Sequence, residues 1–540
     1  MKRRFVSILM ALVMALSLLP AQALADDTNV TKLTRISGDL GSGVYQLDAD
    51  VTITTTLTIT GNTTLDLNNH VLKMTGSGSV FKIENGGHLT LTDTAATKTP
   101  KYFDRNDTTG LWSWRTDNST SAYSVSGGVI TGGTGLPDRN TNGYGGGVYV
   151  DGGGHLTMTG GSIVGCKAEG YIAYGGGVFV AKGGQFTMSG GSITGCTAVA
   201  QGYGHAYGGG IRNHGDVNDS NVGHTTLSGA AVIRDCHAKC ANAYIDTSYG
   251  GGISDGGTLT ISGDVTIIGC TAGGQGSDAM YVNGNNDSSV TGGTFYGSIQ
   301  DPKNKISGLT VTYQLNNENY ATQVVPSGHT TSIPDPDKPN HTFSGWYKDG
   351  TLWDSSTPVT ESLTLTGWLY APVTSEKEFT DALADNSIDV IRLKNDITLP
   401  RLNWSMIIRD NRQLTLDLNG YVLDLGENPI DVGTISVGTI SVGIMTIMDS
   451  RPNEPHKFTP DTDGLWVWDK GANTGTETVL GGVITSSKSS SHNAIGVSTY
   501  GQVIMNGGNI VGHKTGGKSG GAVHVTNGGK FTMTGGSIVG

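Results

Sequence analysis

The chain has 540 residues with a formal net charge of −12; only 15% of the residues are charged, and 84 are glycine. The negative charge argues against nucleic acid and anionic membranes as partners. Glycine without a Gly-X-Y period excludes collagen, and plentiful valine, isoleucine and leucine exclude a disordered chain. Short apolar runs that end at glycine turns predict an all-β repeat protein.

The first 25 residues have the pattern of a secretory signal peptide. Lys2, Arg3 and Arg4 precede an apolar run over residues 5–19, and an Ala-Leu-Ala cleavage site ends at Ala25. The apolar run is short for a membrane anchor, and no second long apolar run follows it. We therefore predict cleavage after Ala25 and a mature segment that is secreted or held at the cell surface, without insertion into the membrane.

One sequence unit returns several times between residues 30 and 300. It reads GGGVYVDGGGHLTMTGGSIVGCKA at 145–168 and GGGVFVAKGGQFTMSGGSITGCTA at 175–198, with looser copies at 208–238 and 250–272. Within a copy, apolar and polar residues alternate in short runs bounded by glycine, which is the period of a β-strand. One copy cannot bury its own aliphatic side chains, but a stack of copies can.

These repeats predict a right-handed parallel β-helix, in which each coil lays its short strands beside those of the next coil at about 4.8 Å. The handedness follows the general rule for parallel crossovers. A β-propeller is the alternative, but it needs about four antiparallel strands per blade. Inward-facing residues should form two aliphatic columns, namely Val148, Val178, Ile211 and Ile253, and Ile163, Ile193, Ile233 and Ile267.

A second, longer repeat surrounds the short one. TLDLNNHVL (64–72) returns as TLDLNGYVL (415–423), and GLWSW (110–114) returns as GLWVW (464–468). We predict one β-helix module over 30–300 and a second over 373–540. The second pattern breaks off at Gly540 without a capping coil, which solenoids need for solubility. We therefore expect this chain to be part of a longer protein.

Residues 306–371 lose the glycine rhythm and form a different domain. LTVTYQL (309–315) is followed by FSGWY (343–347) and LTLTGW (363–368). This segment resembles the internalin-type B-repeat, or Listeria–Bacteroides repeat, with Asn316-Asn317 where that family usually has Gly-Gly. The resemblance implies a small β-grasp-like module of a bacterial surface protein, with a spacer or adhesive role and no catalysis. The flanking modules resemble the pectate-lyase-like superfamily in its repeat-rich surface-protein form.

A catalytic site on a β-helix would need a cluster of carboxylates from neighbouring coils. Such a cluster should appear as Asp or Glu at one position of successive copies, but the outward positions hold mainly Thr, Ser and Tyr. Asp66 and Asp417 recur in the two TLDLN motifs, and we interpret each as a residue that stabilises a turn. We predict no catalytic residue and keep an enzyme as an alternative.

Cysteines recur at one position of the repeat and predict an inward column. Buried thiols and disulfides between coils are the two alternatives. His513 takes the same position in the second module, which favours thiols. The CHAKC run lacks the spacing of a zinc or haem site, so no metal or cofactor is predicted. The column contains Cys166, Cys196, Cys236 and Cys270, and the fifth cysteine is Cys240.

Two tryptophan pairs are the candidates for glycan binding: Trp112 with Trp114, and Trp466 with Trp468. Residues two apart share one face of a strand, and exposed aromatic rings stack on sugars. The alternative is a flap that packs over the first coils of each module. The predicted function is adhesion, with polysaccharide or the glycans of host or neighbouring cells as partners. A polysaccharide lyase or hydrolase and a structural stalk are alternatives, because the fold alone cannot choose among them.

Overall fold

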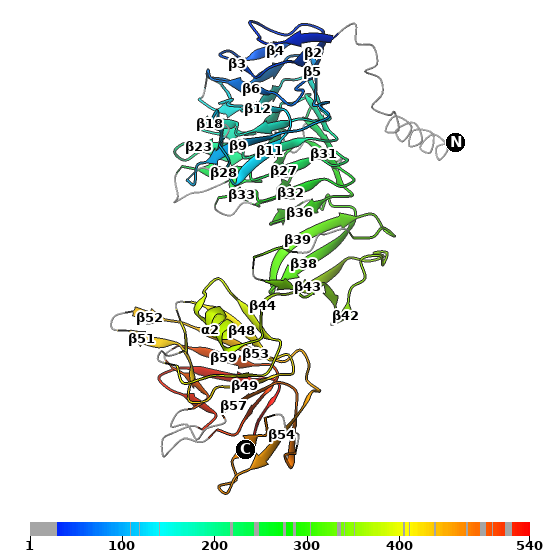
Figure 1. Cartoon of the computed structure of the whole chain (residues 1–540). Helices are drawn as coiled ribbons and strands as arrows, with labels where there is room; N and C mark the ends of the chain where they lie inside the picture. Colours follow the sequence, from blue (N-terminus) through cyan, green and yellow to red (C-terminus); the bar gives the residue numbers. More distant parts are fainter. Residues whose placement is uncertain are drawn as a thin grey trace, which may run out of the picture. The chain divides into compact units, whose positions relative to one another are not determined.

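The computed structural model describes most of the chain after residue 29, so the predicted signal peptide lies outside the described residues. The described ranges are 30–108, 110–117, 119–139, 141–215, 220–241, 248–273, 277–283, 288–302, 304–331, 336–339, 341–349, 351–402, 406–409, 411–436, 439–470, 474–486, 493–498, 500–513 and 521–539. The chain divides into two compact units (Figure 1). The first contains residues up to Tyr313 with Asn319–Ile333 and Asp354–Thr364, and the second contains Gln314–Glu318, Pro334–Trp353 and Leu365–Gly540.

The first unit contains a parallel β-helix of three long sheets, which we call A, B and C. Sheet A consists of β1 (Val30–Leu33), β2 (Gly43–Leu47), β5 (Asn62–Asp66), β8 (His88–Thr92), β16 (His155–Met158), β21 (Gln185–Met188), β26 (His224–Leu227), β31 (Thr258–Ile261) and β35 (Ser289–Val290). Sheet B contains β3 (Val51–Ile53), β6 (Val71–Met74), β12 (Val129–Thr131), β17 (Ser162–Val164), β22 (Ser192–Thr194), β27 (Val232–Arg234), β32 (Thr266–Ile268) and β36 (Thr294–Phe295). Sheet C contains β4 (Leu57–Ile59), β7 (Phe81–Ile83), β15 (Val148–Val150), β20 (Val178–Val180), β25 (Ile211–Asn213), β30 (Ile253–Asp255), β34 (Met280–Val282) and β37 (Ile299–Gln300).

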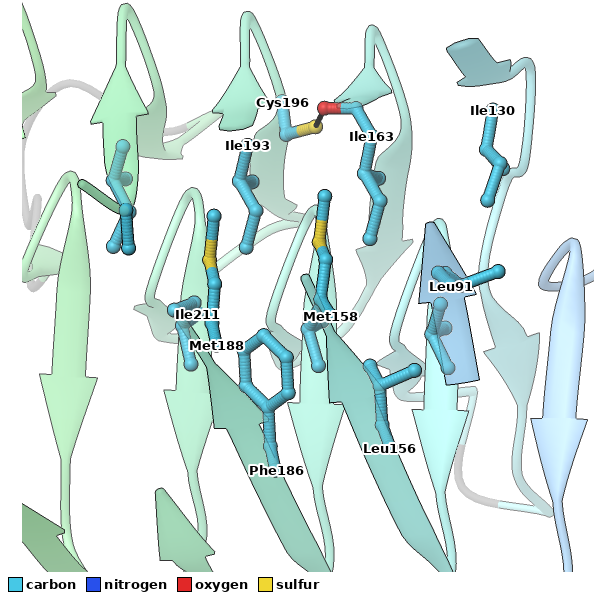
Figure 2. Packing of buried hydrophobic residues seen from close by; sticks show 14 of the residues in the cluster. Leu91, Ile130, Leu156, Met158, Ile163, Phe186, Met188, Ile193, Cys196 and Ile211 are labelled. Carbon is cyan, nitrogen blue, oxygen red and sulfur yellow. Dashed lines mark hydrogen bonds between the residues drawn. The ribbon is translucent and has the colours of Figure 1, made fainter. Parts of the chain in front are cut away.

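The predicted aliphatic columns are present in this β-helix. Val148 pairs in parallel with Val178, and Ile163 pairs in parallel with Ile193. The same registers continue to Ile211 and Ile253 in sheet C, and to Ile233 and Ile267 in sheet B. Figure 2 shows the resulting core, in which Ile130, Ile163 and Ile193 follow one another on successive strands. The parallel β-helix is confirmed, and parallel pairing of equivalent strands excludes the propeller.

Shorter sheets lie beside the three long ones in the first unit. A flap, flap 1, consists of β9 (Pro100–Arg105), β10 (Trp112–Trp114) and β11 (Tyr123–Ser126), paired antiparallel. The tyrosine sheet consists of β13 (Leu136–Pro137), β14 (Gly143–Tyr144), β19 (Ala173–Tyr174), β24 (Ala206–Tyr207) and β29 (Ser248–Tyr249). A further parallel sheet contains β18 (Lys167–Gly170), β23 (Thr197–Ala200), β28 (His237–Cys240) and β33 (Thr271–Ala272).

The described residues of the segment that resembles a B-repeat form seven strands, and the segment contributes residues to both units. They are β38 (Leu309–Leu315), β39 (Glu318–Val325), β40 (Thr342–Phe343), β41 (Tyr347–Lys348), β42 (Thr351–Leu352), β43 (Leu363–Gly367) and β44 (Leu369–Val373). Asn316 and Asn317, between β38 and β39, both have positive φ angles of 52° and 68°. Two such residues form a type I′ hairpin turn, for which asparagine is the best substitute for glycine, and this explains the departure from Gly-Gly.

The second unit repeats the β-helix with sheets A′, B′ and C′. Sheet A′ continues from β44 through β45 (Val390–Leu393), β48 (Gln413–Asp417), β53 (Ile444–Met448), β59 (Gln502–Met505) and β62 (Lys530–Met533). Sheet B′ contains β46 (Ile397–Thr398), β49 (Val422–Asp424), β57 (Val483–Thr485), β60 (Asn509–Val511) and β63 (Ser537–Val539), and sheet C′ contains β47 (Met406–Ile408), β50 (Ile430–Val432), β58 (Ile495–Val497) and β61 (Val523–Val525). Outside them lie the hairpin β51 (Thr434–Ser436) and β52 (Thr439–Ser441), and flap 2, which consists of β54 (Pro455–Pro460), β55 (Trp466–Trp468) and β56 (Glu477–Leu480).

A short helix, α2 (Glu376–Ala384), covers the first coil of the second β-helix. Its N-terminus is a variant of the capping box, in which the Ser375 side chain accepts from the Glu378 backbone N–H and Glu378 accepts from the backbone N–H of Thr374, one residue before the N-cap. At the other end, the buried Arg412 guanidinium donates to the carbonyls of Ala382 and Leu383, and also of Asp385 and Ile388. Arg412 therefore satisfies carbonyl groups that a buried helix end would leave without partners. The described part of the chain contains no helix with the length and apolar character needed to cross a bilayer.

Candidate functional site

The predicted tryptophan pairs lie in the two flaps, and one member of each pair is buried. Trp112 is 2% exposed and packs with Phe103 and Tyr123 of flap 1, at centroid distances of 5.9 and 5.1 Å. Trp468 is 8% exposed in the apolar cluster under flap 2. The expectation of exposed pairs is therefore wrong for Trp112 and Trp468, whose rings cannot reach a sugar. Trp114 and Trp466 are half-buried, and for them a glycan role stays a prediction.

The tryptophans are buried because the flaps cover the outward face of sheets B and B′, which is apolar at these coils. Val71, Val129 and Val164 point out of the β-helix and form the cluster with Trp112. Gly195 lies directly under the Trp112 ring, where any side chain would overlap the indole, and its carbonyl accepts from the Trp112 backbone N–H. The flap is thus a packing element, as the alternative interpretation proposed.

The cysteine column is present and consists of thiols. All five cysteines are free and buried. Cys196 Sγ lies 3.6 Å from the carbonyl oxygen of Ile163, one coil earlier, as Figure 2 shows, and Cys236 has the same contact with Ile193. Burial raises the pKa of Cys236 well above its usual value, so this thiol stays protonated. In the second module, burial lowers the pKa of His513 to about 4, so a neutral imidazole takes the equivalent position.

Asp66 and Asp417 perform the same structural task in the two modules. The Asp66 carboxylate accepts the backbone N–H groups of Asn68 and Thr94, and Asp417 accepts those of Asn419 and Ser450. Each carboxylate therefore ties one turn to the next coil, and the interpretation as turn-stabilising residues is confirmed. Among the described residues, no group of three or more His, Cys, Asp and Glu side chains could hold a metal ion.

Sequence reasoning missed a row of tyrosines on the first β-helix. Tyr144, Tyr174, Tyr207 and Tyr249 occupy equivalent positions in successive coils, because the parallel strands of the tyrosine sheet are in register. Neighbouring rings are stacked at centroid distances of 5.0, 5.4 and 5.4 Å and interplanar angles of 8–12°. The signal was available, since a tyrosine precedes Gly-Gly-Gly in all four copies of the repeat. We call these four residues the tyrosine ladder.

The outward column of sheet C runs beside the ladder and changes along its length. It holds Tyr149, Phe179, Arg212, Ser254 and Tyr281 in successive coils. Phe179 packs on Tyr174 at 5.8 Å, and the Arg212 guanidinium lies 4.8 Å from the centre of the Tyr207 ring. Beside Tyr249 the column offers only the small Ser254. At this coil the ladder therefore has no large side chain of sheet C beside it. The ring of Tyr281, in the next coil, makes an interplanar angle of 45° with the ring of Tyr249.

A cavity of about 270 Å³ opens where the outward column of sheet C changes from Arg212 to the smaller Ser254. Its walls are Tyr207, Tyr249 and Tyr281, together with Arg212 and Asn283, and its floor includes Asp255 and two glycines. Gly256 belongs to that floor, because a Cβ there would come within 2.9 Å of Arg212 Nη2.

The floor of the cavity rests on a buried polar pair inside the β-helix. Asn213 and Asp255 replace the valines found at the same inward position in the adjacent coils, and both are fully buried. Asn213 Nδ2 donates to Asp255 Oδ1 at 2.8 Å, and the same oxygen accepts from the Gly257 backbone N–H at 3.0 Å. Burying a carboxylate is costly unless its partners are fixed, so this pair holds the Gly256–Gly257 turn in place.

A second regular surface lies on sheet A. From β5 to β31, successive strands each carry one outward threonine of a continuous row, and each pairs in register with the next. The threonines are Thr64, Thr90, Thr157, Thr187, Thr226 and Thr260. This face is therefore a row of hydroxyl groups repeated at the spacing of the coils.

The comparisons with known proteins identify two modules. Residues 310–370 match the family model of the Listeria-Bacteroides repeat domain, and residues 370–460 match that of the pectate lyase-like adhesive domain. A search of curated proteins and a search of solved structures found no match. Both resemblances noted in the sequence are confirmed, and the chain contains a bacterial surface repeat directly followed by a pectate lyase-like adhesive domain.

Proposed function

We propose that this protein acts outside the cell as an adhesive surface protein and that its first β-helix module binds glycans. The two matched families support an adhesive role at a bacterial surface. The observation that carries the glycan proposal is the tyrosine ladder, a regular row of partly exposed phenol groups along one side of the β-helix. Polysaccharides are also regular, so repeated weak contacts add up along an extended chain.

The ladder presents to a ligand mainly the hydroxyl-bearing edges of its rings, and not their faces. Stacking uses both faces of Tyr174 and Tyr207, so a ligand meets the outer edges of these rings. Burial raises the pKa of Tyr207, which keeps its hydroxyl protonated and able both to donate and to accept. Sugar hydroxyls have the same double capacity, and an edge that combines apolar carbon with a polar tip suits them.

Retention on polysaccharides tests this function. The purified protein is mixed with plant, mucin and bacterial polysaccharides, and both retained protein and released oligosaccharides are measured in the same tubes. We expect retention without cleavage, and weaker retention of the double variant Tyr174→Phe with Tyr207→Phe, which keeps the stack but removes two hydroxyls. The matched control is Tyr171→Phe with Tyr203→Phe, two exposed tyrosines outside the ladder.

The other outcomes discriminate among the alternatives. Oligosaccharides that accumulate at catalytic protein concentrations would make the protein a lyase or hydrolase. The absence of both retention and cleavage would contradict glycan binding and favour a structural stalk.

A further inference from the structure

We propose that the cavity beside Tyr281 is a subsite for one uncharged pyranose ring of the glycan. This inference rests on the proposed function and deepens it, since it names where the ligand is fixed and what chemistry the site selects. The ladder alone is a uniform row and offers no point at which a ligand is held. The cavity interrupts that row at a single coil.

The size of the cavity suits one sugar ring. Sites for drug-sized molecules commonly measure about 300–1,000 Å³, and this cavity of about 270 Å³ lies just below that range, as a site for a single small ring should. It exists because the outward column of sheet C changes from Arg212 to Ser254, while the tyrosine ladder continues to Tyr249. The tilt of 45° between Tyr249 and Tyr281 breaks the parallel stacking that occupies ring faces elsewhere in the ladder. An aromatic face at the cavity wall is a surface on which the apolar side of a pyranose can lie.

The polar groups around the cavity suit hydroxyls and disfavour a charged ligand. Arg212 and Asn283 supply donors, and the side-chain carbonyl of Asn283 supplies an acceptor. Burial raises the pKa of Asp255, and the hydrogen bonds from Asn213 and Gly257 and the charge of Arg212 oppose that rise. A ligand carboxylate would be attracted by Arg212 and repelled by the charge of the buried Asp255, whereas a neutral polyhydroxylated ring can bond to Arg212 without that repulsion.

The site is held rigidly before any ligand arrives. Arg212 Nη1 donates to Ser254 Oγ at 3.0 Å, and its guanidinium stacks on Tyr207. The Asp255 carboxylate is fixed by Asn213, by the Gly257 backbone N–H and by Ser288. Preorganised polar groups reduce the ordering cost of binding, which matters for a small ligand with few contacts.

The test uses the whole protein and soluble sugars. Methyl glycosides of glucose, galactose, mannose and N-acetylglucosamine, together with their β-linked or α-linked disaccharides and galacturonic acid, are screened by saturation-transfer NMR and titrated by calorimetry. We expect at least one neutral sugar to bind, galacturonic acid to bind no better than galactose, and Tyr281→Ala to weaken binding by about tenfold or more. Asn283→Ala should weaken binding by several fold, and Tyr203→Ala, which alters an exposed ring elsewhere in the module, should not.

One further variant and a stability measurement separate loss of the site from loss of the fold. Tyr281→Phe keeps the ring and should retain most of the affinity, and all variants should keep the thermal midpoint of the wild type. Retention on a polysaccharide that Tyr281→Ala and Asn283→Ala leave unchanged would overturn the subsite and leave the proposed function intact. A preference for galacturonic acid would also overturn it. Failure to bind any soluble sugar or any polysaccharide would overturn both proposals.

Discussion

The carboxylates of Asp66 and Asp417 have equivalent backbone N–H and hydroxyl partners, but they differ in the partner on the preceding strand of the sheet. Asp66 accepts from Gln46 Nε2 at 2.8 Å, whereas Asp417 accepts from Arg392 Nε at 2.6 Å. The pair in the second module is thus an ion pair with little solvent access, with side-chain exposures of 15% for Arg392 and 0% for Asp417. Removing Asp417 leaves the charge of Arg392 without its partner, whereas removing Asp66 leaves only the uncharged amide of Gln46.

We therefore predict that Asp417→Ala costs more stability than Asp66→Ala. The loss should be about 3–5 kcal/mol for Asp417, where Arg392 is left unpaired, and about 1–3 kcal/mol for Asp66. Hydrogen exchange read locally in β48 and in β5 would measure each cost within its own module. Asp461→Ala, in an exposed turn of flap 2, is the control. Equal losses at Asp66 and Asp417 would contradict the argument from charge.

Asp66 also makes the first module sensitive to acid. Burial raises the pKa of Asp66, but hydrogen bonds from Thr94, Gln46 and Asn68 outweigh burial and leave this pKa below its usual value. The stability it contributes is present above the pKa of an unfolded aspartate, near about 4, and is lost as the pH falls through the lower folded value.

His237 should make the first module lose stability at a higher pH than Asp66 does. Burial, with a smaller contribution from Arg105 and Lys239, lowers its pKa to about 4. The folded first module then binds fewer protons than the unfolded chain, so its stability is complete above about pH 6.5 and falls as the pH drops toward 4. The loss from this one group is at most about 3 kcal/mol. We expect His237→Asn to flatten the pH dependence of exchange in β28 between pH 6.5 and 4.5; an unchanged slope would assign the effect to other groups.

At the scale of elements, the two flaps have the same strand register but bury opposite tryptophans. Trp112 and Trp114 pair with Arg105 and Phe103, and Trp466 and Trp468 pair with Pro460 and Phe458. Nevertheless, the buried member is Trp112 in flap 1 and Trp468 in flap 2. Gly195, over which the Trp112 ring lies, corresponds by position to Gly540, which is outside the described residues.

Because of this reversal, we predict that replacing the first tryptophan destabilises flap 1 more, whereas replacing the second tryptophan destabilises flap 2 more. Trp112→Ala should destabilise flap 1 by about 3–5 kcal/mol and Trp114→Ala by clearly less, whereas Trp468→Ala should exceed Trp466→Ala in flap 2. Limited proteolysis within 100–126 and 455–480 would report flap opening. Gly195→Ala should open flap 1 as Trp112→Ala does, because its methyl group would overlap the indole. The same order in both flaps would show that burial of the ring is not what holds them.

At the scale of the whole molecule, the features that could be predicted are those that follow directly from the period of the sequence repeat. The columns through Val148 and Ile163 could be predicted because parallel coils bring equivalent residues together. The tyrosine ladder obeys the same rule, since each of its residues directly precedes the Gly-Gly-Gly at which a copy of the repeat begins. The cavity could not be predicted, since it arises where a ladder and a neighbouring column differ in side-chain size at Ser254. Burial of Trp112 and Trp468 depends equally on contacts between segments far apart in the sequence.

The stacking of coils also predicts how far the effect of a destabilising substitution extends along the β-helix. Each coil of the first β-helix contacts mainly its two neighbours, so its stability should be a sum of coils and interfaces between them. Ile193→Ala, at a fully buried position, should cost about 2–5 kcal/mol. Hydrogen exchange should then rise most in β17 and β27, which flank β22, and least in β3 and β36, the first and last parallel strands of sheet B.

Thr187→Ala is the matched control, because Thr187 lies in the same coil and points to solvent. It should leave the exchange of every strand close to that of the wild type. Equal acceleration in all strands of sheet B after Ile193→Ala would mean that the module unfolds as one cooperative block, because opening would then involve every coil at once. A graded response would instead show that the repeated unit in the sequence is also the unit of stability.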